Sequence, residues 1–178
     1  MINITDEDWK YFYSYLENFV NREEIYKVIK KKASFEQFVE LLYSCRYKED
    51  SINKFGIIFS LFPHSMNVYE FTKMCQIFLK ELWHREHETM IGYLQDDESV
   101  KSKENIDVLL YLMNNLPEFY KYDDDLKYPF IRKIFYAIAS QPKPYSREVL
   151  EELALNKDER IKEYALYQLE RIEQVGNE

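Results

Sequence analysis

The segment SREVLEELALNKDERIKEYALYQLERI, residues 146–172, holds two runs of apolar side chains separated by a polar stretch. Apolar residues that recur every three or four positions share one face of a helix. The first run consists of Val149, Leu150 and Leu153, and the second of Ile161, Ala165, Leu169 and Ile172. We therefore predict two short helices, one starting at Ser146 and the other capped by Asn156 with Glu159 as its reciprocal partner.

The second predicted helix has a small residue, Ala165, on its apolar face, which lets a partner helix approach closely. The pattern Leu-x-x-Leu-Ala from Leu150, followed by Asn-x-Asp-x-x-Ile-Lys-x-x-Ala-x-x-x-Leu from Asn156, resembles the HEAT repeat. That resemblance implies stacked antiparallel helix hairpins, an arrangement known as an α-solenoid. It also implies that Asp158 and Lys162 bond to the neighbouring repeat, although Lys cannot make the forked contact of the more usual Arg.

Helical spacing continues along the rest of the chain. Three pairs have the spacing of a capping box: Thr5 with Asp8, Ser34 with Gln37, and Asn67 with Glu70. Apolar stripes follow these pairs, and further helical segments are predicted at 25–32, 85–94, 106–116 and 130–138. The nearly all-apolar run 55–62 fits either a buried strand or a buried helix that ends at Pro63. We favour the helix because its neighbours are helical.

These segments predict an all-α chain of about ten helices in about five antiparallel pairs, each spanning about 30–40 residues. We expect a single helical-repeat domain over residues 1–178, with 146–173 as its clearest repeat unit. An irregular helical bundle is the alternative. Three glycines and five prolines in 178 residues agree with a helical chain. Sheets with many tight turns, Rossmann folds and phosphate loops all consume glycine.

Charge, hydropathy and cysteine content argue against nucleic-acid binding, membrane association and secretion. The net charge of −8 argues against nucleic acid, because phosphate binding requires clustered Lys and Arg. No apolar run approaches the roughly 20 residues that cross a bilayer, so no membrane association is expected. The first residues, MINITDEDWK, lack the basic and apolar regions of a signal peptide. Together with just two cysteines, this leads us to expect a cytoplasmic protein.

Few side chains suggest chemistry. His84 and His87 lie three positions apart beside Glu88, whereas the helical zinc motif needs histidines four positions apart. We therefore expect a solvated, charged helix end there and no metal. Cys45 and Cys75 fall on apolar stripes and are expected to be small buried hydrophobes. No nucleophile elbow, Gly-rich phosphate loop or kinase-like set of residues occurs, so we expect neither enzymatic activity nor a cofactor.

Two acidic clusters are the candidate partner-binding residues. The first is Asp96, Asp97 and Glu98, which follows a predicted helix. The second is Asp123, Asp124 and Asp125 in the predicted loop YKYDDDLKYP, flanked by Tyr120, Tyr122 and Tyr128. Tyrosine anchors combined with carboxylates would suit a basic protein partner. The alternative is that both clusters are solvated loops.

A small, acidic, aromatic-rich helical-repeat chain is similar in style to the immunity proteins of bacterial polymorphic toxin systems. The resemblance implies stoichiometric binding of a cognate basic toxin domain, such as a nuclease, whose substrate surface the carboxylates would cover. The alternative from another class is a general adaptor or regulatory subunit with a helical binding face.

Overall fold

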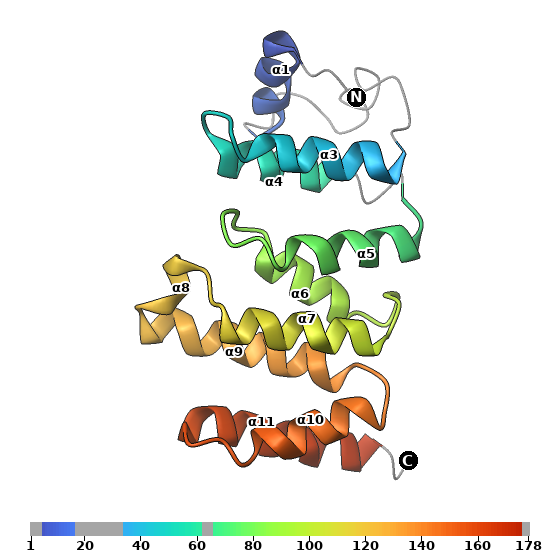
Figure 1. Cartoon of the computed structure of the whole chain (residues 1–178), viewed down its shortest axis with the longest axis vertical. Helices are drawn as coiled ribbons and strands as arrows, with labels where there is room; N and C mark the ends of the chain where they lie inside the picture. Colours follow the sequence, from blue (N-terminus) through green and yellow to red (C-terminus); the bar gives the residue numbers. More distant parts are fainter. Residues whose placement is uncertain (1–4, 17–33, 62–65, 176–178) are drawn as a thin grey trace. The chain divides into compact units, whose positions relative to one another are not determined.

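The structure is a computed structural model that describes residues 5–16, 34–61 and 66–175. Every regular element within these ranges is a helix, which confirms the all-α prediction (Figure 1). The ten helices are α1 (Asp6–Leu16), α3 (Phe35–Cys45), α4 (Ser51–Leu61), α5 (Val68–Phe78), α6 (His87–Gln95), α7 (Lys103–Asn114), α8 (Glu118–Lys121), α9 (Asp124–Ala139), α10 (Tyr145–Leu153) and α11 (Glu159–Val175).

The capping predictions for the first half of the chain are confirmed. Reciprocal side-chain and backbone hydrogen bonds join Thr5 with Asp8, Ser34 with Gln37, and Asn67 with Glu70. The apolar run after Ser51 is the helix α4 and not a strand. The helix predicted around Ile25, Val28 and Ile29, with the basic run Lys30–Lys32 at its end, lies outside the described residues.

The described chain divides into two compact units. The first takes in the residues up to Phe71 together with Trp83–Arg85. Within it α3 packs on α4, and α1 packs on α4. The core of this unit includes an aromatic cluster: the His84 imidazole stacks on Phe55 with ring centroids 4.2 Å apart, and the Trp83 ring meets Phe55 edge-on at 5.1 Å. Whether the chain forms one continuous repeat domain stays a prediction.

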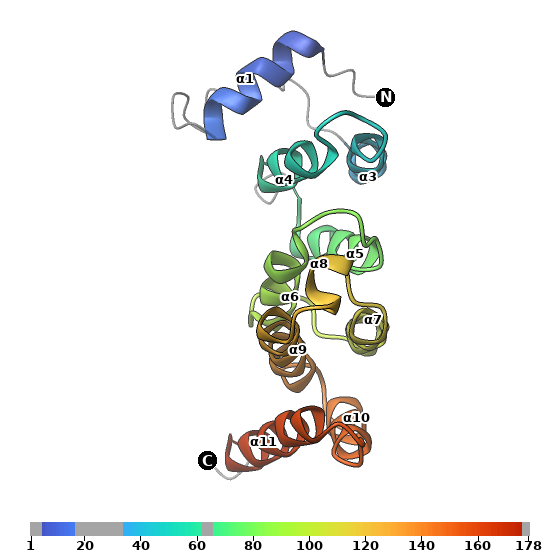
Figure 2. The same ribbon diagram turned by 90° about the vertical axis from the view of Figure 1, so that its left-hand side faces the viewer.

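The second unit consists of Thr72–Leu82 and the residues from Glu86 onward. In it α7 packs on α9 and α10 on α11, while α9 lies between α6 and α11 and contacts both. Figure 2 shows α6, α9 and α11 along one side of this unit and α7 and α10 along the other. The helices α6, α9 and α11 run parallel, because residues near the start of one helix contact residues nearer the start of the next, and residues near its end contact residues nearer the next one's end. Glu88 pairs with Lys133 and Leu94 meets Ser140, while Tyr128 meets Asp158 and Tyr136 meets Tyr167.

A buried amide network joins four segments of the second unit. The Asn105 side chain accepts from Gln76 Nε2 at 2.7 Å and donates to the Val100 carbonyl at 2.8 Å and to Gln141 Oε1 at 2.9 Å. Gln141 Nε2 in turn donates to the Leu94 carbonyl at 2.9 Å. The network therefore ties the C-terminal end of α6 to the start of α7 and to the end of α9.

The last hairpin forms as predicted, with two corrections at its helix starts. Helix α10 begins at Tyr145 after Pro144, one residue before the predicted start at Ser146, which is buried in the first turn. At α11 the cap is Asp158 and not Asn156: Asp158 Oδ1 accepts from the backbone N–H groups of Arg160 and Ile161 at 3.0 and 3.4 Å. Asn156 instead accepts from the Asp158 N–H, which shapes the turn before the helix.

Asp158 also links the last hairpin to α9, as the HEAT resemblance implied, but its partner there is Tyr128. Its Oδ2 accepts the Tyr128 hydroxyl of α9 at 2.9 Å. Lys162 pairs within its own helix, with Glu159 at 3.3 Å. Partial burial alone would raise the pKa of Asp158, but the hydrogen bonds from Tyr128 and the helix N-terminus outweigh it and lower that pKa.

We expect Asp158→Ala to lower the free energy of unfolding by about 0.5–2 kcal/mol, because it removes the cap of α11 and the acceptor of Tyr128. Asp158→Asn is the matched control, since Asn keeps the shape and caps a helix nearly as well. Urea denaturation of both variants measures the effect. An Ala variant as stable as the Asn variant would contradict the capping role.

Candidate functional site

A groove of about 690 Å³ opens in the second unit between α6, α9 and α11. Its size falls within the range of roughly 300–1,000 Å³ that is usual for ligand sites. The groove is lined by Gly92, Gln95, Asp96 and Asp97 from the end of α6, by Tyr136, Ala139, Ser140 and Lys143 from the end of α9 and the turn after it, and by Gln168, Arg171 and Ile172 from α11.

Small side chains give the groove its depth. Ala139 and Ser140 stand where α9 ends, between the walls formed by α6 and α11. Gly92 lies inside α6, and a β-carbon placed on it would meet no atom within 4 Å. None of these three residues places a long side chain in the groove.

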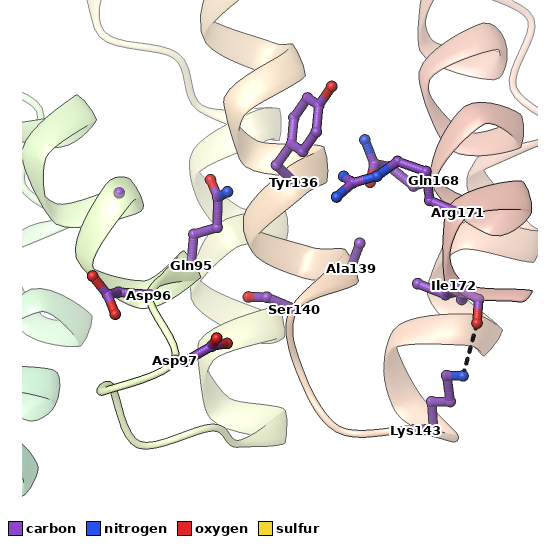
Figure 3. Close-up of a pocket in the computed structure, with 11 residues that line it drawn as sticks. Gln95, Asp96, Asp97, Tyr136, Ala139, Ser140, Lys143, Gln168, Arg171 and Ile172 are labelled. Carbon is purple, nitrogen blue, oxygen red and sulfur yellow. Dashed lines mark hydrogen bonds between the residues drawn. The ribbon is translucent and has the colours of Figure 1, made fainter. Parts of the chain in front are cut away.

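The two walls of the groove carry opposite charges (Figure 3). Asp96 and Asp97 stand on the α6 side, and Lys143 and Arg171 stand on the opposite side. The Arg171 guanidinium is held 4.8 Å above the Tyr136 ring and donates to Gln168 Oε1 at 2.9 Å. Within the described part of the chain, neither Asp97 nor Arg171 forms an ion pair.

The two lysines near the groove, Lys101 and Lys143, donate hydrogen bonds to backbone carbonyl oxygens. Lys101 Nζ donates to the carbonyl oxygens of Leu94, Gln95 and Asp96 at 2.9, 2.9 and 2.6 Å, which closes the C-terminal end of α6. Lys143 Nζ donates to the Ile172 carbonyl at 3.0 Å, near the end of α11. Helix C-termini carry partial negative charge, and these ammonium groups stabilise it. Burial lowers the pKa of Lys101, although Asp97 and Asp96 oppose that shift.

The groove contains part of the first predicted cluster. Asp96 ends α6, and its Oδ1 accepts the Glu98 N–H at 3.1 Å. Asp96 and Asp97 both line the groove, whereas Glu98 is exposed beside it. These carboxylates sit at a helix C-terminus, whose partial negative charge the Lys101 ammonium offsets.

The second predicted cluster is not a loop. Asp123 is the N-cap of α9, with its Oδ1 accepting the Asp125 N–H at 2.9 Å, and Asp124 and Asp125 form the first turn. Carboxylates are favoured at this position because the helix N-terminus carries partial positive charge. The cluster therefore has a structural role, and part of its charge is compensated by the helix itself.

The three tyrosines near this cluster differ in exposure. Tyr122 is 77% exposed, with the Lys121 ammonium 5.5 Å from its ring centre. Tyr120 is 8% exposed, stacks on Phe130 and donates its hydroxyl to Glu88 at 2.7 Å, so it is a core residue and not a surface anchor. The Tyr128 hydroxyl is bound to Asp158.

The two acidic clusters lie at opposite ends of α9. Its 16 residues rise about 1.5 Å each, which separates the clusters by roughly 24 Å. A single compact contact centred on one cluster would not reach the other.

Sequence reasoning missed the basic wall of the groove. This wall consists of Lys143, from a segment predicted to break the chain between helices, and of Gln168 and Arg171, from the last predicted helix. Their spacing in the sequence does not relate them to Asp97. Gly92 did offer a signal, because a glycine inside a helix costs stability and calls for a reason.

The histidines predicted at a solvated helix end are buried. His84 and His87 are both fully inaccessible, because each belongs to the core of its unit. His87 Nε2 lies 3.0 Å from the Glu81 carbonyl oxygen and must donate to it, since a carbonyl can only accept. Among the described residues, no three His, Cys, Asp or Glu side chains are grouped as metal ligands would be. Cys45 and Cys75 are buried thiols, as predicted.

The chain matches no protein-family model, and no curated protein or solved structure is significantly similar to it. Within the described ranges, no helix combines the length and apolar character that crossing a bilayer requires.

We expect Gly92→Ala to raise the free energy of unfolding by roughly 0.5–1 kcal/mol, because Ala is a better helix former than Gly. The added methyl group enters open space. Chemical denaturation of the wild type and the variant measures the change. A less stable variant would show that other atoms pack against Gly92 in solution, which would contradict the open groove wall.

We expect stability to depend on the charge state of His87. Burial lowers its pKa to about 4, although the hydrogen bond to Glu81 opposes the shift. Between about pH 6.5 and pH 4 the unfolded chain binds a proton there that the folded chain does not. The free energy of unfolding should therefore fall as the pH drops through this window, by on the order of 3 kcal/mol from this residue, with no contribution above it.

Urea denaturation at pH 7 and pH 4.5 of the wild type and His87→Gln tests this dependence. The variant loses packing at both pH values, so the comparison uses the difference between them. That difference should be smaller in the variant, and equal differences would contradict the assignment.

Proposed function

We propose that the chain is a protein-binding α-solenoid, and specifically an immunity protein that neutralises a cognate bacterial toxin by stoichiometric binding in the cytoplasm. Inhibition needs no chemistry from this chain: its acidic surface covers the basic surface with which the toxin holds its substrate. A general adaptor or regulatory module is the alternative.

The arrangement of the second unit supports the solenoid part of this proposal. Helices α6, α9 and α11 run parallel as neighbours, and α7 and α10 return the chain between them. Stacked helix hairpins produce this order, because each unit contacts its neighbours in sequence. The bond from Tyr128 to Asp158 joins consecutive hairpins through the aspartate that the HEAT resemblance singled out.

The observation that carries the binding function is the groove with unpaired charges on its walls. Charged groups that form no ion pair inside their own chain are available to opposite charges on a partner. The carboxylates Asp96, Asp97 and Glu98 stand at the end of α6, where no helix N-terminus compensates them. The single Lys101 ammonium offsets part of this charge, so a basic protein would meet net negative charge there.

The partner can be isolated from the native cell with the tagged protein, and its association rate then measured at two salt concentrations. We compare two variants with the same change in charge: Asp96→Asn/Asp97→Asn/Glu98→Gln, and Asp123→Asn/Asp124→Asn/Asp125→Asn. The groove variant should associate roughly three- to tenfold more slowly at low salt, and the second variant should change less. Both rates should converge towards that of the wild type as salt screens the charges.

Two results would contradict this proposal. Equal wild-type rates at both salt concentrations would exclude steering by charge. A partner whose expression alone leaves bacterial growth unchanged would exclude the immunity role and favour the adaptor. Growth inhibition by the partner, relieved by co-expression of this chain, is the expected outcome.

A further inference from the structure

Gly92 has no role that the fold itself requires. It lies in the interior of α6 and does not adopt a positive φ, so the backbone conformation does not demand glycine. No neighbouring atom would touch its β-carbon, so close packing within the chain does not demand it either. Glycine at such a position costs stability, and it permits another backbone to approach closely. An external chain at the groove wall would use that opening.

The charges on the groove walls restrict what can bind. Lys143 donates to the Ile172 carbonyl and keeps its charge, so it stands with Arg171 as positive charge on one wall, opposite the Asp96 and Asp97 carboxylates on the other. A simple cation would gain from Asp97 but be repelled by Arg171. A simple anion would gain from Arg171 but be repelled by Asp96 and Asp97. The occupant that satisfies both walls carries both signs of charge.

Arg171 is arranged to recognise a carboxylate. Its guanidinium lies over the Tyr136 ring and is fixed by Gln168, a side chain that is 1% exposed. A planar guanidinium that is already held in place loses little freedom when it forms two parallel hydrogen bonds with a carboxylate. The opposite wall offers the Asp97 carboxylate to a Lys or Arg side chain.

We propose that this groove binds an extended segment of the partner protein that carries a lysine or arginine for Asp97 and a carboxylate for Arg171, with its backbone passing Gly92. This inference rests on the proposed protein-binding function and specifies which side chains of the partner the groove recognises. An extended polypeptide fits because its side chains present both charges while its backbone stays thin enough to pass the open wall of α6.

A phage-displayed library of random dodecapeptides, panned on the full-length protein, tests the groove without knowledge of the partner. Enriched peptides are then synthesised and their dissociation constants measured. Gly92→Trp fills the groove from a position where a larger side chain meets no atom near the β-carbon. Asp97→Lys and Asp125→Lys form a matched pair, because each changes the net charge equally but only the first lies in the groove. Circular dichroism confirms that each variant is folded.

The expected result is a family of peptides with both a basic and an acidic residue, bound at least about tenfold more weakly by Gly92→Trp and by Asp97→Lys. Asp125→Lys should change binding by less than about twofold, and Arg171→Gln should remove the preference for the acidic residue. Failure to enrich any peptide would overturn the inference. Equal binding to wild type and Gly92→Trp, or equal losses in the two Lys variants, would overturn it as well.

The same variants separate this inference from the proposed function once the partner is known. If the partner binds the wild type and Gly92→Trp equally, the binding function stands and the groove is not its site. If the selected peptides bind in the groove but the partner has no toxicity, the groove stands and the immunity role fails.

Discussion

The side-chain amide of Asn105 is fully buried, and its three hydrogen-bond partners lie in three different segments of the chain. A buried amide left without partners costs about 1–3 kcal/mol per group, so packing arrangements that leave it unpaired are disfavoured. Gln141 extends the same constraint to the end of α6 through the Leu94 carbonyl. These bonds help to hold α6 against α9, and with it the acidic wall of the groove.

Local patterns in the sequence predicted the helices well and their contacts poorly. The capping pairs Ser34–Gln37 and Asn67–Glu70 involve residues three positions apart, so the sequence contains everything needed to find them. The link between Tyr128 and Asp158 spans 30 positions, and the pattern predicted the acceptor but not the donor. His87 was misjudged for the same reason, because a polar neighbourhood in sequence does not reveal which side of a helix faces the core.

The candidate site was predicted in part. Asp96 and Asp97 were found because a run of carboxylates is visible in the sequence, but Arg171 was not, since its relation to them exists only after α6, α9 and α11 have packed. The two acidic clusters are similar in sequence but lie at opposite kinds of helix end. One caps the N-terminus of α9 and is compensated by it, whereas the other follows the C-terminus of α6 and has the Lys101 ammonium as its neighbouring cation.

The parallel course of α6, α9 and α11 has an electrical consequence for the second unit. Three peptide dipoles point the same way, so their positive ends gather at one edge and their negative ends at the other. Asp123 and Asp158 offset the positive ends of α9 and α11, and the Lys101 and Lys143 ammonium groups offset the negative ends of α6 and α11. At physiological salt such a field fades within about 8 Å. The field that remains therefore acts only on groups within about a nanometre of either edge.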